Sequence, residues 1–168
     1  MSQFNIPSSG NFVVVPRKDG DILLAKGFIF TPKEEELVDQ YLKKKAYCQD
    51  LPCEIIKPID DLYKMNSDQI PMRDFVYGKT NEAFFFTDNH TRYLEDNQTF
   101  CPTSGGYWQV TDTNKQVLDR NNNIIGYKDR LIFFGGKYPN GQISNYAIEE
   151  FRLNSQQNAT LDLNIRNN

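Results

Sequence analysis

The sequence has little that could support metal or covalent chemistry. Its 168 residues include one histidine, His90, and three cysteines, Cys48, Cys53 and Cys101. Three thiols cannot all pair within one chain, and the four residues between Cys48 and Cys53 are not a common zinc-ligand spacing. We therefore expect reduced thiols, with no metal ion and no other cofactor.

Long apolar runs are also absent. The longest, Ile22–Phe30, is interrupted by Lys26 and Gly27 and is much shorter than the roughly 18 residues that a membrane-spanning helix needs. The first residues, 1–5, lack the basic start and apolar core of a signal peptide. We therefore expect a soluble intracellular protein that has no membrane partner.

Neither sign of charge dominates the chain. There are 19 Lys and Arg against 22 Asp and Glu, which gives a net charge of −3. Together with 39% apolar residues, this balance excludes an intrinsically disordered chain and a polybasic nucleic-acid tail. Residues 107–137 carry five basic and three acidic residues, a weak bias that would not by itself identify a DNA-binding protein.

No residue pattern is typical of an active site. Asp60-Asp61 and Glu34-Glu35-Glu36 are sequence neighbours, which diverge on a helix, so these carboxylates are expected to be solvated. The glycine pairs at 105–106 and 135–136 lack a following lysine and the spacing of a phosphate loop. Nothing around His90 resembles a nucleophile elbow or an oxyanion loop. We expect no enzymatic activity and no small-molecule substrate.

One helix is strongly indicated after residue 30. Thr31-Pro32-Lys33-Glu34 has the form of a capping box, with Thr31 as the cap and Pro32 as the first helical residue. The residues that follow form one apolar stripe at helical spacing: Leu37, Val38, Tyr41 and Leu42. The lysines at 43–45 match a nuclear localisation signal, but a solvated helix end is the simpler interpretation. A shorter helical turn is predicted at Asp60–Met65.

The later sequence predicts strands. Short aromatic or β-branched segments bounded by Gly, Asn and Pro occur at 83–86, 107–110, 131–134 and 146–153. Residues 119–123 predict a hairpin turn, because asparagine tolerates left-handed backbone angles. A helix packed on such an antiparallel sheet makes an α+β domain, whose size fits a single domain. Residues 1–23 are interpreted as an N-terminal extension with a short strand at 11–15, and residues 154–168 as a disordered polar tail.

The order of the motifs resembles the NAC domain of plant transcription factors. That family opens approximately with L-P-P-G-F-R-F-x-P-T-D-E-E-L-V, which is similar to residues 24–38. Its later motifs follow in order: D-L-Y at 61–63, E-W-Y-F-F at 82–86, G-Y-W-K-A-T-G-x-D-K at 106–115, V-G-x-K at 125–128, L-V-F-Y at 131–134 and E-Y-R-L at 150–153. The resemblance covers residues 24–153. It implies a twisted antiparallel β-sheet packed with an N-terminal α-helix and a second short helix.

The resemblance also implies a function. NAC proteins are nuclear transcription regulators that bind double-stranded DNA with a CGTG-type core, as homodimers or as heterodimers with other NAC proteins. The strand with W-K-A-T-G enters the major groove, where alternate side chains reach base edges. Gln109 and Thr111 then become candidate base readers, and Lys115 and Lys128 candidate phosphate ligands. The full set of DNA-binding candidates is Arg92, Tyr107, Gln109, Thr111, Lys115, Lys128 and Arg130.

Several positions depart from the family's motifs. In W-K-A-T-G-x-D-K the first lysine is Gln109, the glycine is Asp112 and the aspartate is Asn114. In K-K-x-L-V-F-Y the second lysine is Asp129, with Arg130 beside it. Glutamine can bind adenine where lysine favours guanine, so an altered sequence preference is one hypothesis.

Lost DNA affinity is the other hypothesis. The family's basic loop corresponds to residues 89–101, where only Arg92 keeps a positive charge. Each lost phosphate contact removes about 0.9 from the slope of log affinity against log salt. The alternative function is therefore a non-catalytic protein-interaction module that has weakened DNA binding and pairs or competes with intact NAC proteins.

The family dimerises through its N-terminal segment. It uses a salt bridge between the arginine of G-F-R-F and the glutamate before the leucine of D-E-E-L, positions that are Ile29 and Glu36 here. Isoleucine would replace charge with apolar contact, and we assign the dimer interface to Leu24, Phe28, Ile29 and Glu36. Family members usually carry a long regulatory region after the domain, whereas fifteen residues follow Leu153. We interpret the chain as a short, divergent member that lacks this region and could compete with intact relatives.

Overall fold

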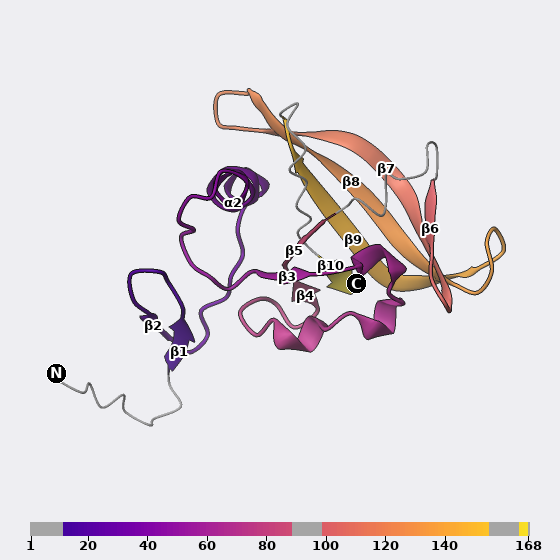
Figure 1. Ribbon diagram of the computed structural model, residues 1–168, viewed down its shortest axis with the longest axis horizontal. Coiled ribbons are helices and arrows are strands. Elements are labelled where there is room, and N and C mark those ends of the chain that lie inside the picture. The colour runs from indigo at the N-terminus through magenta and orange to yellow at the C-terminus, as the bar shows by residue number, and fades with distance from the viewer. Residues whose placement is uncertain (1–11, 89–98, 155–164, 168) are drawn as a thin grey trace.

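A long, twisted antiparallel sheet is the largest element of the computed structural model, which describes residues 12–88, 99–154 and 165–167 (Figure 1). Its three long strands are β7 (Gly106–Leu118), β8 (Ile124–Gly135) and β9 (Gln142–Leu153). Within the described ranges the sheet has the order β4-β10-β9-β8-β7-β6, completed by β4 (Glu82–Ala83), β6 (Phe100–Pro102) and β10 (Ile165–Asn167). Together with the helices described next, this confirms the predicted α+β fold.

Two small sheets lie outside the large one. Strands β1 (Phe12–Val15) and β2 (Ile22–Ala25) form an antiparallel hairpin, which confirms the short strand predicted near residue 11. Strands β3 (Lys57–Ile59) and β5 (Phe85–Thr87) pair in parallel. Within the segment predicted to be a disordered tail, residues 165–167 form β10, which pairs with β4 and β9.

The predicted helix exists, but it begins later than expected. It runs through α1 (Glu34–Glu36), the wider π-helical η1 (Leu37–Leu42) and α2 (Lys43–Ala46). Lys33 is extended, with ψ 158°, and its N–H donates to Glu36 Oε2 at 3.2 Å. The prediction of Thr31 as the cap was therefore wrong. A run of three glutamates offers the same closing contact in three registers, and spacing alone does not choose between them.

The apolar stripe of this helix is buried as predicted. Leu37, Val38, Tyr41 and Leu42 are between 0% and 7% exposed and belong to the hydrophobic core. The second predicted helix is a single 3-10 turn, η2 (Leu62–Lys64), followed by two further turns, η3 (Ser67–Gln69) and η4 (Met72–Asp74). In Figure 1 the magenta coils of these turns lie on one side of the large sheet and α2 lies at its end.

The turn between β7 and β8 depends on one carboxylate. Asp119 Oδ1 accepts the backbone N–H groups of Asn121 at 2.8 Å and Asn123 at 2.9 Å. Asn122 has a positive φ of 61°, a conformation that asparagine adopts more readily than most residues. The hairpin turn predicted at 119–123 is confirmed. The backbone and side chain of Asn123, with help from the Asn121 N–H, hold the pKa of Asp119 below its ordinary value of 3.8.

This pKa makes the contribution of Asp119 to stability dependent on pH. Because the folded-state pKa is lowered, the contribution is present above 3.8 and is lost as pH falls through the folded-state value. We expect Asp119→Ala to lower the urea midpoint at pH 7, and the deficit to narrow below pH 3.8. Asp60→Ala, which removes an exposed carboxylate outside the hairpin, is the control. A stability deficit of equal size at pH 7 and below pH 3.8 would contradict the lowered pKa of Asp119.

Candidate nucleic-acid interface

Strand β7 is paired on both sides only along its first part. β6 pairs with it from Tyr107 to Gln109, and the Val110 N–H donates to the Thr99 carbonyl at 2.8 Å. Beyond this point, no strand of the described residues pairs with the outer side of β7. The pairing with β8 is also irregular there, with register shifts between Val110 and Asp112 and between Asp112 and Lys115. The second half of β7 is therefore an exposed, bulged edge.

Trp108 fixes the first half of β7 in the core. Its side chain is 0% exposed, packs against Phe133 with ring centroids 5.0 Å apart, and donates Nε1–H to the Met65 carbonyl at 2.9 Å. Tyr107, a DNA-binding candidate, is also buried and stacks on Phe134. Its hydroxyl accepts the Gly141 N–H at 3.1 Å. Tyr107 thus holds the strand in place and is not presented to the outside.

The two candidate base readers lie near the start of the exposed edge. Gln109 is half-buried and donates Nε2–H to the carbonyls of Thr99 at 3.0 Å and Val110 at 3.3 Å. Thr111 is exposed, and its hydroxyl donates to the Arg130 carbonyl at 3.2 Å. Both polar groups therefore have partners in the chain, and Thr111 is the more accessible of the two.

Each candidate cation that the structure describes is paired with a carboxylate. Lys115 Nζ lies 3.7 Å from Asp112, and Arg130 lies 3.5 Å from Glu149. Lys128 pairs with Glu34 of α1, is only 18% exposed and also lies over the ring of Phe151. Arg92 lies outside the described residues.

The carboxylates Glu34 and Glu149 were not expected from the sequence. The second could have been found from the β8–β9 register, in which Arg130 and Glu149 are direct partners.

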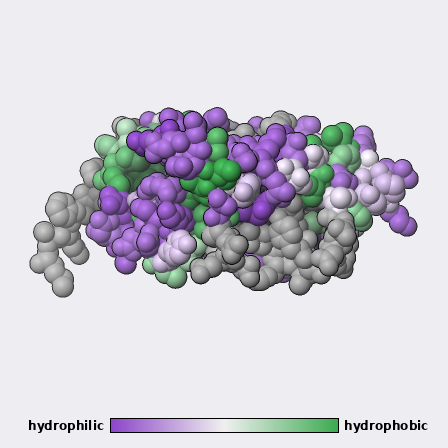
Figure 2. Space-filling model, turned by 90° about the horizontal axis from the view of Figure 1, so that it is seen from above, coloured by the Kyte–Doolittle hydropathy of each residue, from purple (hydrophilic) through white to green (hydrophobic). Residues whose placement is uncertain are grey.

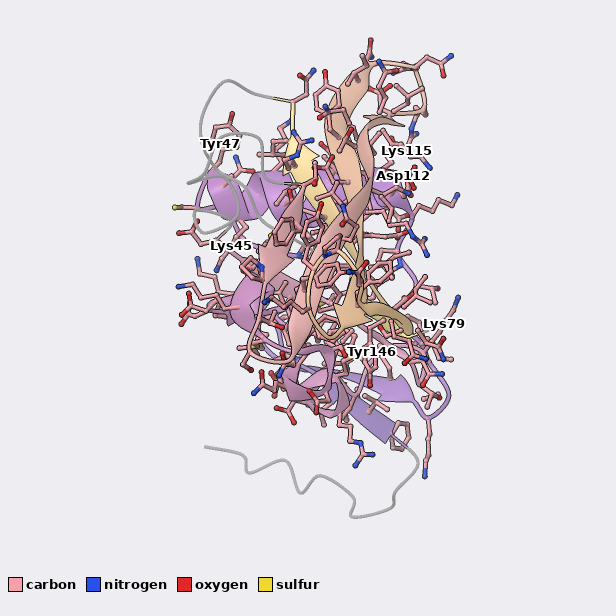
Figure 3. The ribbon with its side chains drawn as sticks, turned by 90° about the vertical axis from the view of Figure 1, so that its right-hand side faces the viewer. Lys45, Tyr47, Lys79, Asp112, Lys115 and Tyr146 are labelled. Atoms are coloured by element: carbon pink, nitrogen blue, oxygen red, sulfur yellow. The ribbon has the colours of Figure 1, made fainter. Side chains whose placement is uncertain are left out.

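Asp112, at the position of the family's glycine, lies beside Lys115. Residues three apart in a regular strand point to opposite faces of a sheet, and the register shift between these two brings their side chains together. Figure 3 shows both on the same side of the molecule, opposite Lys45 and Tyr47. The bulge therefore places a negative charge on the same surface as the lysine expected to hold phosphate.

The candidate dimer residues are presented unequally. Phe28 and Ile29 are 61% and 47% exposed, whereas Leu24 lies on the inner face of the β1–β2 hairpin, partly buried against the core. Glu36 is exposed and occupied by the Lys33 N–H. The outer face of the hairpin adds three exposed apolar residues that sequence reasoning missed: Phe12, Val14 and Leu23. In Figure 2 one of the hydrophobic patches lies at the end of the molecule nearest the N-terminal trace.

Sequence comparison identifies the family to which these features belong. The model of the No apical meristem (NAM) family, the NAC domain, matches residues 25–153. The chain belongs to this family. It is 34% identical over 134 residues to NAC domain-containing protein 96 of Arabidopsis thaliana, covering 80% of this chain and 46% of that protein. It is 38% identical over 130 residues to NAC transcription factor 25 of the same plant, covering 77% and 39%. The chain thus spans about half or less of the length of these relatives.

Other kinds of site have little support. In the described ranges, no three His, Cys, Asp or Glu side chains are arranged to hold a metal ion, and no helix is long and apolar enough to cross a membrane. Cys53 and Cys101 are buried, and Cys48 is exposed. The Tyr41 hydroxyl lies 3.2 Å from Cys53 Sγ, and burial raises the pKa of this tyrosine. Tyr41, Cys53 and Cys101 thus belong to the hydrophobic core.

The pair between Glu34 and Lys128 links the helix to the sheet and can be measured directly. Because Lys128 is mostly shielded while Glu34 is about half exposed, we expect a coupling free energy of about 1 kcal/mol. A double-mutant cycle with Glu34→Gln and Lys128→Gln, followed by urea unfolding, checks this value. The same cycle at the fully exposed pair of Lys18 and Asp50 should give a clearly smaller coupling, because solvent screens both charges. Equal coupling free energies at the two pairs would contradict the stronger coupling expected for Glu34 and Lys128.

Proposed function

We propose that this chain is a sequence-specific, DNA-binding transcription regulator of the NAC type that acts in the nucleus. The observation that carries the proposal is the exposed edge of β7 from Thr111 to Lys115, in the segment that matches the W-K-A-T-G-x-D-K motif. A strand edge fits the major groove and brings backbone and side-chain polar groups to the base edges. Family membership supports the same function.

Base contacts would come from the start of this edge. Thr111 is accessible as it stands and needs only to rotate its hydroxyl from the Arg130 carbonyl. Gln109 would exchange its two carbonyl contacts for the N6 and N7 positions of adenine. Lys115, Lys128, Arg130 and Arg92 would hold phosphates, and Tyr107 would keep the strand in position.

Ion pairing within the chain lowers the expected affinity. A lysine or arginine that binds phosphate must first leave its carboxylate partner. Each such contact therefore contributes less binding free energy than a contact made by a cation that has no partner to leave. Asp112 adds repulsion where the backbone would approach DNA. We therefore propose weak binding with a shallow dependence on salt.

A second function is favoured by the same ion pairs. If they stay closed, the domain acts as an interaction module that pairs or competes with intact NAC proteins. The exposed apolar side chains of Phe28 and Ile29 support a dimer through the N-terminal segment, either with a second copy or with another NAC protein.

DNA binding is tested by fluorescence anisotropy of the folded domain. Duplexes with the CGTG-type core and single-base variants of it are titrated at two salt concentrations. We expect preferential binding of one sequence, with affinity that falls as salt rises, and a changed preference for Gln109→Lys because lysine favours guanine. Flat titrations at low salt would reject the DNA-binding function in favour of the interaction module. An unchanged preference in Gln109→Lys would reject the role of this residue as a base reader.

Dimerisation is tested with two matched charge insertions. Ile29→Glu places a carboxylate in the proposed interface. Ile143→Glu is the control, because it places the same charge outside that interface, at an exposed isoleucine of β9 (Ile29 is 47% exposed and Ile143 63%). We expect the first to raise the dissociation constant of the dimer at least about tenfold, equivalent to about 1.4 kcal/mol, and the second to leave it unchanged. Sedimentation over a concentration series gives both constants. Equal constants for the two variants would place the interface elsewhere.

A further inference from the structure

The bulge that shapes the exposed edge of β7 is centred on Asn114. This residue has a φ of +53°, in the left-handed region that asparagine adopts more readily than most residues other than glycine, and it lies within the register shift between Asp112 and Lys115. Such a conformation persists when the surrounding contacts hold it. The contacts that do so here come from β8, which pairs with β7, and from β9, the next strand of the sheet.

Three side chains close a network around the bulge. The Asn114 N–H donates to Asp129 Oδ1 at 2.7 Å. Arg152 Nη2 donates to the same carboxylate oxygen at 2.9 Å and to Asn114 Oδ1 at 2.6 Å. Asp129 is only 2% exposed, and a carboxylate buried to this degree needs charged and hydrogen-bonded partners. Each of the three residues therefore contacts the other two, from three adjacent strands.

The network continues into the core. Arg152 Nε lies 3.7 Å from the carboxylate of Glu150, which is 0% exposed and accepts a hydrogen bond from the Tyr63 hydroxyl. Tyr63 lies in η2, so the bulge is connected through buried polar groups to the layer below the sheet. Asp129 and Glu150 are the buried members of this network, and buried carboxylates that are paired restrict the groups they contact more than an exposed ion pair does.

We propose that Asn114, Asp129 and Arg152 form a positioning network that sets the direction of Lys115 on the β7 edge. Lys115 follows Asn114 directly, and the extra residue in this bulge is what brings its ammonium group to the side of Asp112. Loss of the network would let the strand return to regular alternation, which turns Lys115 to the other face. The proposal rests on the proposed function only where it concerns DNA; the arrangement of the network is a property of the free protein.

The network also connects two departures from the family's motifs. Where those motifs have aspartate and lysine, this chain has Asn114 and Asp129. In this chain the carboxylate stands on β8 and the amide on β7, and Arg152 contacts the side chains at both positions through one nitrogen. An aspartate at 114 beside Asp129 would make two carboxylates share one guanidinium nitrogen, and a lysine at 129 would leave the Asn114 N–H without its acceptor. Each departure therefore compensates for the other.

A double-mutant cycle tests this compensation. We expect Asn114→Asp and Asp129→Lys each to raise the unfolding equilibrium constant at least tenfold in urea titrations. The double variant, which restores the arrangement of the family's motifs, should be at least tenfold more stable than the two single effects predict when added. Additive effects would overturn the coupling. Asn114→Gly keeps the left-handed backbone and the N–H but removes the side-chain contact with Arg152. It should raise the unfolding equilibrium constant less than Asn114→Asp or Asp129→Lys does.

The positioning role has its own measurement. Amide hydrogen exchange by NMR should become at least tenfold faster at Asn114 in Asp129→Ala, and the signals of Asp112 and Lys115 should shift. Asp119→Ala, which removes the carboxylate of the nearby hairpin, should leave Asn114 protected. Unchanged exchange and unchanged signals in Asp129→Ala would overturn the role, whether or not the protein binds DNA. If the wild-type domain binds no duplex, the proposed function fails, and exchange at Asn114 still decides the network.

Discussion

Burial of Trp108 is the constraint on which the use of β7 depends. A side chain of this size with no exposed surface, whose N–H is bonded to the Met65 carbonyl, ties the strand both to the sheet and to the turns that lead from η2 to η3. The adjacent Tyr107 is held in the same way by Phe134 and Gly141. Because this half of β7 is held in the core, the outer edge that no other described strand covers begins at Thr111, with the half-buried Gln109 at its border. The bulges of β7 then decide which side chains that edge presents.

Charge compensation is the second constraint on this surface. The carboxylates that pair with its cations come from α1, β9 and β7 itself: Glu34, Glu149 and Asp112. In the proposed function a phosphate group would compete with these internal partners, so the net gain of each contact would be the difference between two ion pairs in different surroundings. This competition differs in degree along the edge. The side chains of Lys115 and Asp112 are both largely exposed, so separating this pair costs little free energy. Lys128, in contrast, is shielded from solvent and already packs on Phe151.

Local patterns in the sequence predicted the elements, and contacts between distant residues decided the rest. The stripe of Leu37, Val38, Tyr41 and Leu42 and the turn at 119–123 depend on neighbours only a few residues away, and both were found. The start of the helix was missed because three successive glutamates satisfy the same local rule. The pair of Lys128 with Glu34 joins residues 94 positions apart, and the bulge at Asn114 depends on two other strands. Alternation along β7 therefore could not be extended past Val110.

The helix that follows the N-terminal segment connects the two surfaces of the molecule. Phe28 and Ile29 are exposed a few residues before Glu34, and Glu34 holds Lys128 on the sheet. The same first turn contains Glu36, which fixes where the helix begins by accepting the Lys33 N–H. A partner that bound the apolar segment and moved this turn would change the position of Glu34, and with it the availability of Lys128. If the chain dimerises and binds phosphate as proposed, the two events would be coupled through one turn of helix, because Glu36 sets where this turn begins and Glu34, in the same turn, pairs with Lys128 on the sheet.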